Sequence, residues 1–546
     1  MHQLRAHAPT VFLLLLALWL WWPAFGAVPV EGFGAMLVSV ARGWQTGTLA
    51  LVDAAYPFDT EFYLLTRFGM SSAIALFPCA AFDGNLIFAI ITGLGFAVSA
   101  VMGFLFVRQW TDAPPASVLF ALIVLPGFAE SAFFLHENML ALAFFTSAMV
   151  LIGWRQSLWA AAVAGGLLGL ALLTRSDFIL LAPALPLILW ARFATLNRLA
   201  LAIVVGTTAT VATFLVPLLA VGLTPLDLIA VINHSVTLWA RDPLLDIPLR
   251  MAFLFAGAAG LLLLPFGVIS AARNATWPVR LLLLGVPLLF LVIYGSKLWQ
   301  ARQFLPIFPF VLALVAMGGN TLWRLMPSLP GRAVACLLLA FLWLSPGPIV
   351  FFDGPRMLTG QFWSPLVWRD WQNQVADQLA IIDAEVDGLA DGGVLVTDDW
   401  TMDRYTHLAF RENGWTPATT STCRPYVEVW QKADRIAYHA RISMPFVVGP
   451  ERAMPALFDN FVGACLPSIG TPVLHHLAVI ESSPSPDMPA FLQTPPYWAV
   501  EVTTLDQPAM AELLRIYRED AGDRASTRDR IDAETETLQG ITSLLQ

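Results

Sequence analysis

The chain has 546 residues, of which 57% are hydrophobic and only 13% are charged, whereas soluble domains carry about 25% charged residues. Residues 1–350 contain 16 Lys and Arg against 12 Asp and Glu, and residues 351–546 contain 14 against 27. For the first part, this composition excludes a water-soluble enzyme core, a nucleic-acid-binding protein and a disordered chain. It predicts a polytopic membrane protein that ends in an acidic soluble domain.

Apolar segments of the length needed to cross a bilayer, about 20 residues in a helix, recur along the first part. Eleven lie near residues 10–29, 85–107, 115–128, 138–153, 158–173, 178–191, 199–221, 251–271, 279–294, 304–320 and 333–351. Trp21-Trp22-Pro23 follows the first segment in place of a small-residue cleavage site, which favours a retained span over a signal peptide. We therefore expect a polytopic α-helical membrane domain over residues 1–351, with residues 30–84 as its first outer loop.

The arginines give the predicted spans an orientation. With the N-terminus in the cytoplasm, every inner connection contains at least one arginine, as the positive-inside rule requires. These are Arg108, Arg155, Arg192, Arg198, Arg273, Arg280, Arg324 and Arg332. Only two of the 30 basic residues are lysines, which is typical of a GC-rich bacterial genome. The sequence predicts a bacterial inner-membrane protein whose odd number of spans places residues 352–546 in the periplasm.

The C-terminal part indicates a periplasmic α/β domain over residues 352–520, followed by a polar, mobile tail over 521–546. Strand-like runs lie at 393–397, 445–449, 477–481 and 499–503, and helical runs near 369–390, 400–413, 453–463 and 507–519. Cys423 and Cys465 are the only cysteines of this domain. They would form a disulfide in an oxidising compartment, and the alternative is two free thiols.

The first outer loop contains two acidic residues among aromatic ones. Asp59 and Glu61 stand two residues apart, Tyr63 follows them, and Arg67 comes four residues later. A carboxylate in a partly dehydrated loop at the membrane surface has a raised pKa, so it can act as a general base. The alternative is a solvated loop with exposed acids.

The next outer turn carries His136-Glu137 at the mouth of the fourth span. A zinc-protease motif is excluded because residue 140, where the second histidine would stand, is leucine. Glu137 is either a site residue or an acid that favours the N-terminal dipole of the helix.

Two further clusters place ionisable groups at predicted outer boundaries, where each is a site candidate because charge at membrane depth costs about 2.5–3.5 kcal/mol on insertion scales. Arg175 and Asp177 lie between the fifth and sixth spans, and the alternative to a site is that they pair with each other. Lys297 and Arg302 stand five residues apart among aromatic residues. They are suited to hold a lipid-linked phosphate, and the alternative is snorkelling to headgroups.

The order of these motifs resembles the GT-C superfamily of integral-membrane glycosyltransferases, such as protein O-mannosyltransferases and lipid A aminoarabinose transferases. The resemblance covers about residues 10–350 and rests on an acid in the first outer loop, a second acid at the next outer turn, an L-x-R-x-D-x₅-P element from residue 173, and R-Q-F-L-P-x-x-P from residue 302. Two departures are present. Thr60 separates two acids that are adjacent in the mannosyltransferases, and Gln303-Phe304 replaces the tyrosine of R-Y-L-x-P.

The resemblance implies an inverting glycosyltransferase that moves a sugar from a polyprenyl-phosphate donor to an envelope glycolipid, polysaccharide or protein, on the periplasmic side. Asp59 would be the base, with Glu61 or Glu137 orienting the base or the acceptor. The lipid phosphate would be surrounded by Arg67, Arg175, Lys297 and Arg302, with Tyr63, His136 and Asp177 in secondary positions. The sequence requires no cofactor, and a divalent cation is compatible with it.

Two other classes of function are alternatives. A transporter or flippase of lipid-linked glycans predicts charges within the spans and repeated halves, whereas the acids here lie at outer turns. A non-catalytic membrane scaffold, whose soluble domain binds a partner, predicts that Asp59 is replaceable. Within the first class, an O-antigen ligase or polymerase is a rival, although its large loop typically lies between late spans.

Overall fold

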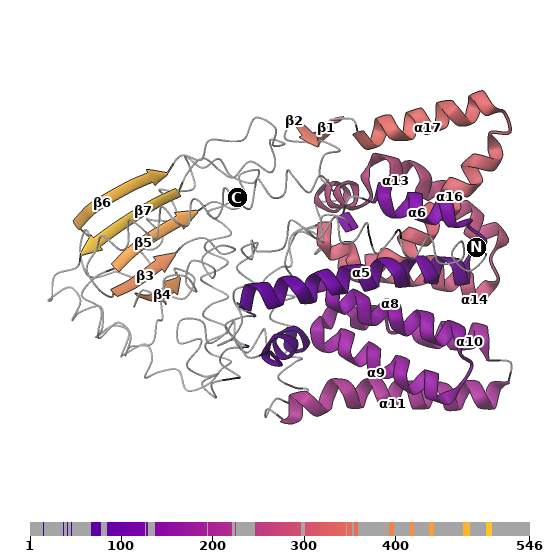
Figure 1. Ribbon diagram of the computed structural model, residues 1–546, viewed down its shortest axis with the longest axis horizontal. Helices are drawn as coiled ribbons and strands as arrows, with labels where there is room; N and C mark the ends of the chain where they lie inside the picture. Colours follow the sequence, from indigo (N-terminus) through magenta and orange to yellow (C-terminus); the bar gives the residue numbers. More distant parts are fainter. Residues whose placement is uncertain are drawn as a thin grey trace.

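A computed structural model of the chain describes residues 67–77, 84–125, 127–128, 137–193, 195–220, 246–295 and 301–344, seven short strands between 347 and 504, and the single positions 12, 15, 37, 41, 45, 224 and 226. Helices form a bundle over the first part, and five of the strands form a sheet at one end of the molecule (Figure 1).

The bundle is built from apolar helices joined by short connections. In its first half lie α5 (Gly84–Trp110), α6 (Pro115–Val124), α8 (Asn138–Trp154), α9 (Leu158–Thr174), the 3₁₀ segment η2 (Ser176–Leu181), α10 (Ala184–Arg192) and α11 (Leu196–Ala220). In its second half lie α13 (Asp246–Asn274), α14 (Trp277–Arg280), the π-helical turn η3 (Leu281–Gly285), α15 (Val286–Tyr294), the 3₁₀ segment η5 (Ala301–Ile307), α16 (Phe308–Leu325) and α17 (Leu329–Leu344).

Helices occupy each of the nine apolar segments predicted between residues 85 and 320. Among the described residues, five helices are long and apolar enough to cross a membrane by length and composition. The last predicted span, 333–351, ends earlier than expected, because α17 stops at Leu344 and strand β1 begins at Gly347. Pro346 and Pro348 follow the helix end closely, and proline can neither donate the helical hydrogen bond nor avoid a clash with the preceding turn. The segment predicted at 10–29 lies outside the described residues, apart from two single positions.

The direction of the helices defines two ends of the bundle. Ser99 of α5 donates a hydrogen bond to the Met139 carbonyl of α8, and Gln109 donates one to the Val150 carbonyl, so α5 and α8 run parallel. A three-residue connection then turns the chain back into α9, which packs between α8 and α11 (Figure 1). α8 therefore begins, and α9 ends, at the end of the bundle where α5 begins.

Close helix packing depends on glycine at two contacts. A Cβ atom on Gly165 of α9 would collide with the Gly206 carbonyl of α11, and the Thr210 hydroxyl donates to the Gly165 carbonyl across the same contact. A Cβ on Gly267 of α13 would collide with the Leu314 carbonyl of α16. Small residues at such crossings let helix backbones approach closely in membrane proteins.

Two irregular turns interrupt the long helices. Gly257 has a φ of 67° inside α13, a conformation that favours glycine, and the helix is broken there. Pro287 follows the π-helical turn η3. Because proline has no backbone N–H, one helical hydrogen bond to the preceding turn cannot form, and the helix is irregular there.

The described strands of the C-terminal part are β1 (Gly347–Phe351), β2 (Gly354–Leu358), β3 (Gly393–Thr397), β4 (Trp415–Thr419), β5 (Ile436–Arg441), β6 (Val473–Ile480) and β7 (Trp498–Thr504). β1 and β2 form an antiparallel hairpin, and the other five form a sheet in the order β4-β3-β5-β7-β6. β3 is parallel to β4 and to β5, whereas β7 is antiparallel to β5 and to β6.

Three of the four predicted strands coincide with β3, β6 and β7. The strand predicted at 445–449, the four predicted helices and the tail at 521–546 lie outside the described residues. Parallel neighbours need crossover connections of a dozen or more residues, and the chain between β3 and β4 has that length. The division into a domain over 1–351 and an α/β domain over 352–520 remains a prediction.

Candidate functional site

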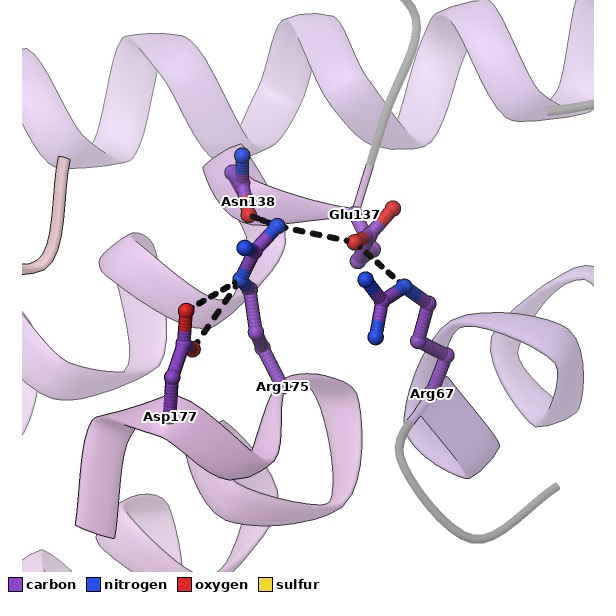
Figure 2. A network of polar contacts seen from close by, with 5 residues as sticks. All are labelled: Arg67, Glu137, Asn138, Arg175 and Asp177. Atoms are coloured by element: carbon purple, nitrogen blue, oxygen red, sulfur yellow. Dashed lines mark hydrogen bonds and ion pairs between the residues drawn. The ribbon is translucent and has the colours of Figure 1, made fainter. Parts of the chain in front are cut away.

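Charged side chains from three segments meet at the end of the bundle where α8 begins and α9 ends (Figure 2). The Arg175 Nη1 atom lies 3.0 Å from Glu137 Oε1, and Arg67 Nε lies 2.7 Å from the same oxygen. Arg175 Nε donates to both oxygens of Asp177, at 2.8 and 3.0 Å. Arg175 Nη1 also donates to the Asn138 side-chain carbonyl. We call these five residues the outer network, after the side of the membrane on which the arginine distribution predicts this end of the bundle to lie.

The outer network is buried. Glu137 is 2% exposed and Arg175 is 7% exposed, and the Asp177 side chain is 10% exposed. Buried charges persist only where they are paired and hydrogen-bonded, and removing one partner of such a pair typically costs about 3–5 kcal/mol. Two guanidinium groups face two carboxylates here, so the charges balance within the network.

The local backbone explains how Glu137 and Arg175 reach each other. Glu137 is the N-cap of α8 but makes no capping hydrogen bond with its side chain, so its carboxylate is directed to the arginines. Arg175 is the C-cap of α9 with an extended backbone, φ −158° and ψ 112°, before the chain turns into η2. A cation at this position also interacts favourably with the C-terminal dipole of the helix.

The third segment, residues 67–75, is a helix that packs directly on the end of α9. A Cβ atom on Gly69 would lie 2.9 Å from the Thr174 backbone nitrogen, which is closer than side chains allow. Glycine at this position therefore permits the approach that brings Arg67 to Glu137. Arg67 in turn fixes the end of the predicted first outer loop against α8.

The electrostatics of the network keep Arg175 charged. Burial acts to lower the pKa of the Arg175 guanidinium, but the carboxylates of Asp177 and Glu137 raise it above its ordinary value. Arg175 thus remains a permanent cation, and its Nε and Nη1 donors are already occupied by carboxylate and amide oxygens.

A second group of residues adjoins the network. η5, which carries Arg302 and the buried Gln303, packs against η2 and α8. Tyr294, the last residue of α15, lies close enough to Arg175 for the two side chains to interact electrostatically. The R-Q-F-L-P element and the L-x-R-x-D element, distant in the sequence, are therefore neighbours in space.

The structure thus brings together four of the predicted site residues, namely Arg67, Glu137, Arg175 and Asp177, with Arg302 on the adjoining segment. The other predicted site residues lie outside the described part of the chain: Asp59, Glu61, Tyr63, His136, Lys297, Cys423 and Cys465. The pairing of Arg175 with Asp177, one of two alternatives from the sequence, is present. Asn138 was not predicted; the sequence signal was a polar residue at the start of an apolar helix, and the structure buries it fully.

The described residues offer few ligands for a metal ion. Among these residues, no group of three or more His, Cys, Asp and Glu is placed to hold one. The two carboxylates of the outer network each bind guanidinium groups, which neutralise the charge that a divalent cation would require.

Comparison with known proteins finds similarity in solved structures. No protein-family model matches the chain, and no curated protein matches it. The crystal structure of ArnT from Cupriavidus metallidurans in the apo state matches with a TM-score of 0.48 and 14% identity, over 93% of this chain and 99% of that one. The Archaeoglobus fulgidus oligosaccharyltransferase in complex with Zn and sulfate matches with a TM-score of 0.46 and 13% identity, over 87% of this chain and 72% of that one. Its apo form gives 0.47 and 12%, over 88% and 75%.

Proposed function

We propose that the chain is an inverting glycosyltransferase of the GT-C type, which transfers a sugar from a polyprenyl-phosphate donor to a cell-envelope acceptor on the periplasmic side of the inner membrane. The observation that carries the proposal is the outer network. It joins the end of the first outer loop, the second acidic turn and the L-x-R-x-D element at one end of an apolar helical bundle.

The outer network serves this reaction by positioning. Asp59 precedes Arg67 by eight residues, and an extended chain of that length spans at most about 28 Å. We propose that Asp59 and Glu61 lie within this reach of the network. The segment around Arg67 in the first outer loop and the start of the fourth span at Glu137 are joined by one ion pair. Precise placement of reacting groups lowers the barrier of a bimolecular reaction.

The reaction itself needs one base and several cations. Asp59 accepts the proton of the acceptor hydroxyl while the acceptor oxygen forms a bond to the anomeric carbon. The bond between that carbon and the phosphate oxygen breaks with inversion, and the electron pair leaves with the polyprenyl phosphate. Glu61 or Glu137 orients the acceptor or the base.

The leaving phosphate gains negative charge, which fixed cations stabilise. Arg302 and Lys297 are suited to contact it directly, since η5 adjoins η2. Arg67 and Arg175 complete the set of cations around the phosphate, and their ion pairs with Glu137 and Asp177 fix their positions. Tyr63 and His136 take secondary positions. The sequence itself requires no metal ion for this reaction, and a divalent cation is compatible with it.

The decisive experiment compares sugar transfer in membranes that contain the wild type, Asp59→Asn or Glu61→Gln, with lipid-linked sugars of the host as donors. Asp53→Asn, an acid in the same loop, is the matched control, and protein amounts are equalised by immunoblot. We expect Asp59→Asn to abolish transfer and to accumulate donor, whose mass then identifies the sugar. Transfer at the wild-type rate in both variants would contradict the proposal, and loss in Glu61→Gln alone would move the base to Glu61.

A further inference from the structure

A pocket of about 420 Å³ lies at the opposite end of the bundle from the outer network. Its walls come from the last residues of α5 (Gln109 and Trp110), the last residues of α10 (Trp190 and Arg192), and the start of α14 with Thr276 before it. Both α5 and α10 end there and α14 begins there, so three helices meet around the pocket (Figure 1). We call it the helix-end pocket.

Arg192 supplies the charge of the helix-end pocket. Its guanidinium lies over the Trp110 ring, 4.5 Å from the ring centroid. Among the described residues, Arg192 forms no ion pair and its buried Nε atom has no hydrogen-bond partner. Asp112, the acid two residues after Trp110, is exposed and does not line the pocket. Burial lowers the pKa of the guanidinium, so an anion that replaces lost solvation would stabilise its charged form.

Two further polar atoms in the same walls lack partners among the described residues. Trp110 is 9% exposed, and its indole Nε1 donor is buried without an acceptor. Gln109 directs its Nε2 group to the Val150 carbonyl, while its buried Oε1 has no donor. Buried polar groups are normally satisfied by protein, water or ligand atoms. Unsatisfied donors of Arg192 and Trp110 beside one pocket therefore favour a ligand that carries acceptor oxygens.

An exposed aromatic pair lies beside the pocket. Trp190 lines the pocket, and Trp277 packs edge to face against it with ring centroids 4.5 Å apart. The two residues are 51% and 48% exposed. Tryptophan is enriched at the level of the lipid headgroups, because it combines an apolar ring with a polar N–H. An exposed aromatic pair beside a cation favours a ligand that is itself amphipathic over a small soluble anion.

We propose that the helix-end pocket binds the phosphate of an anionic membrane phospholipid. Arg192 pairs with the phosphate, Trp110 donates its N–H to a phosphate or glycerol oxygen, and Trp190 and Trp277 contact the glycerol and the first methylene groups. Basic pockets between membrane helices bind anionic headgroups on the cytoplasmic side, the side on which the arginine distribution of this sequence places this end.

The test uses the full-length protein in an uncharged detergent. Native mass spectrometry with phosphatidylglycerol should show bound lipid on the wild type, and phosphatidylcholine at the same concentration should bind less. Arg192→Gln should weaken phosphatidylglycerol binding by about fivefold, the effect of one basic residue at a membrane surface. Trp110→Phe, which keeps the ring and removes the donor, should weaken it by a smaller factor.

Two controls keep the assignment specific. Arg198→Gln removes an exposed arginine of the same end and should leave binding unchanged, and Arg192→Lys should retain part of it. Equal phosphatidylglycerol binding by Arg192→Gln and the wild type would overturn the proposal. Inorganic phosphate is the second comparison. If it raises the unfolding midpoint as much as phosphatidylglycerol does, and Arg192→Gln abolishes this rise, the pocket is a site for free phosphate and the proposal is overturned.

Discussion

The two ends of the helical bundle hold their arginines in opposite ways. In the outer network, Arg67 and Arg175 are held by Glu137 and Asp177, and the charges balance. In the helix-end pocket, Arg192 lies on a tryptophan ring with no ion pair among the described residues. A charge-balanced network needs no further ligand and stabilises the fold, whereas a cation without an ion pair can bind an anionic ligand. The comparison predicts large effects on folding at the first end and small ones at the second.

The largest effect should come from Glu137→Ala. The substitution leaves Arg67 and Arg175 facing each other without their shared carboxylate, and such losses cost about 3–5 kcal/mol of folding free energy. Thermal unfolding of the purified protein should show a large drop in the midpoint, and sugar transfer should be lost with it. Asp112→Ala removes an exposed acid and is the matched control. Similar midpoints for the two variants would contradict a supporting role for the network.

Arg175→Lys should have a smaller effect, because it keeps the charge and removes the fork of donors. One ammonium cannot reach Asp177 through two bonds and Glu137 at the same time. We expect a loss of about 1.5–3 kcal/mol, the range for hydrogen bonds to charged groups. Arg155→Lys, at an exposed position after α8, is the control and should leave the midpoint unchanged. An equal shift in both variants would mean that the several N–H donors of the Arg175 guanidinium do not matter for stability.

Asn138→Ala tests the neutral member of the network. Its side-chain carbonyl accepts from Arg175, so its removal should cost about 1.5 kcal/mol, the low end for hydrogen bonds to charged groups, because Arg175 Nη1 keeps Glu137 as a partner. Unfolding midpoints of the two single variants and of Asn138→Ala with Arg175→Lys form a double-mutant cycle. The losses should not add, because the residues share one contact. Strict additivity would show that Asn138 acts independently of Arg175.

The sequence predicted the helices better than it predicted their contacts. Apolar runs located the helices from α5 to α16, since a span is specified by local composition. The pairing of Arg175 with Asp177 was among the alternatives because the two residues are two apart. The contact of Arg67 with Glu137 was not predictable, because it depends on how the helix at 67–75 packs on α9 through Gly69.

Arg192 shows the same limit at the other end. Its position after an apolar run identified it as one of the arginines that orient the chain, and nothing in its neighbourhood along the sequence distinguished it from Arg198. The difference arises in three dimensions, where Arg192 meets Trp110 of α5 and Arg198 stays exposed. A site built from three helix ends has no spacing that a single sequence reveals.

The smallest effect on folding should come from Arg192→Gln. In an uncharged detergent the wild-type cation is partly desolvated and unpaired, so its removal should change the free energy of unfolding by no more than about 0.5 kcal/mol. Addition of phosphatidylglycerol should then raise the unfolding midpoint of the wild type and leave that of Arg192→Gln almost unchanged, because a ligand stabilises only the state that binds it. A large loss of stability without lipid would mean that Arg192 is held by the protein itself, and the contrast between the two ends would disappear.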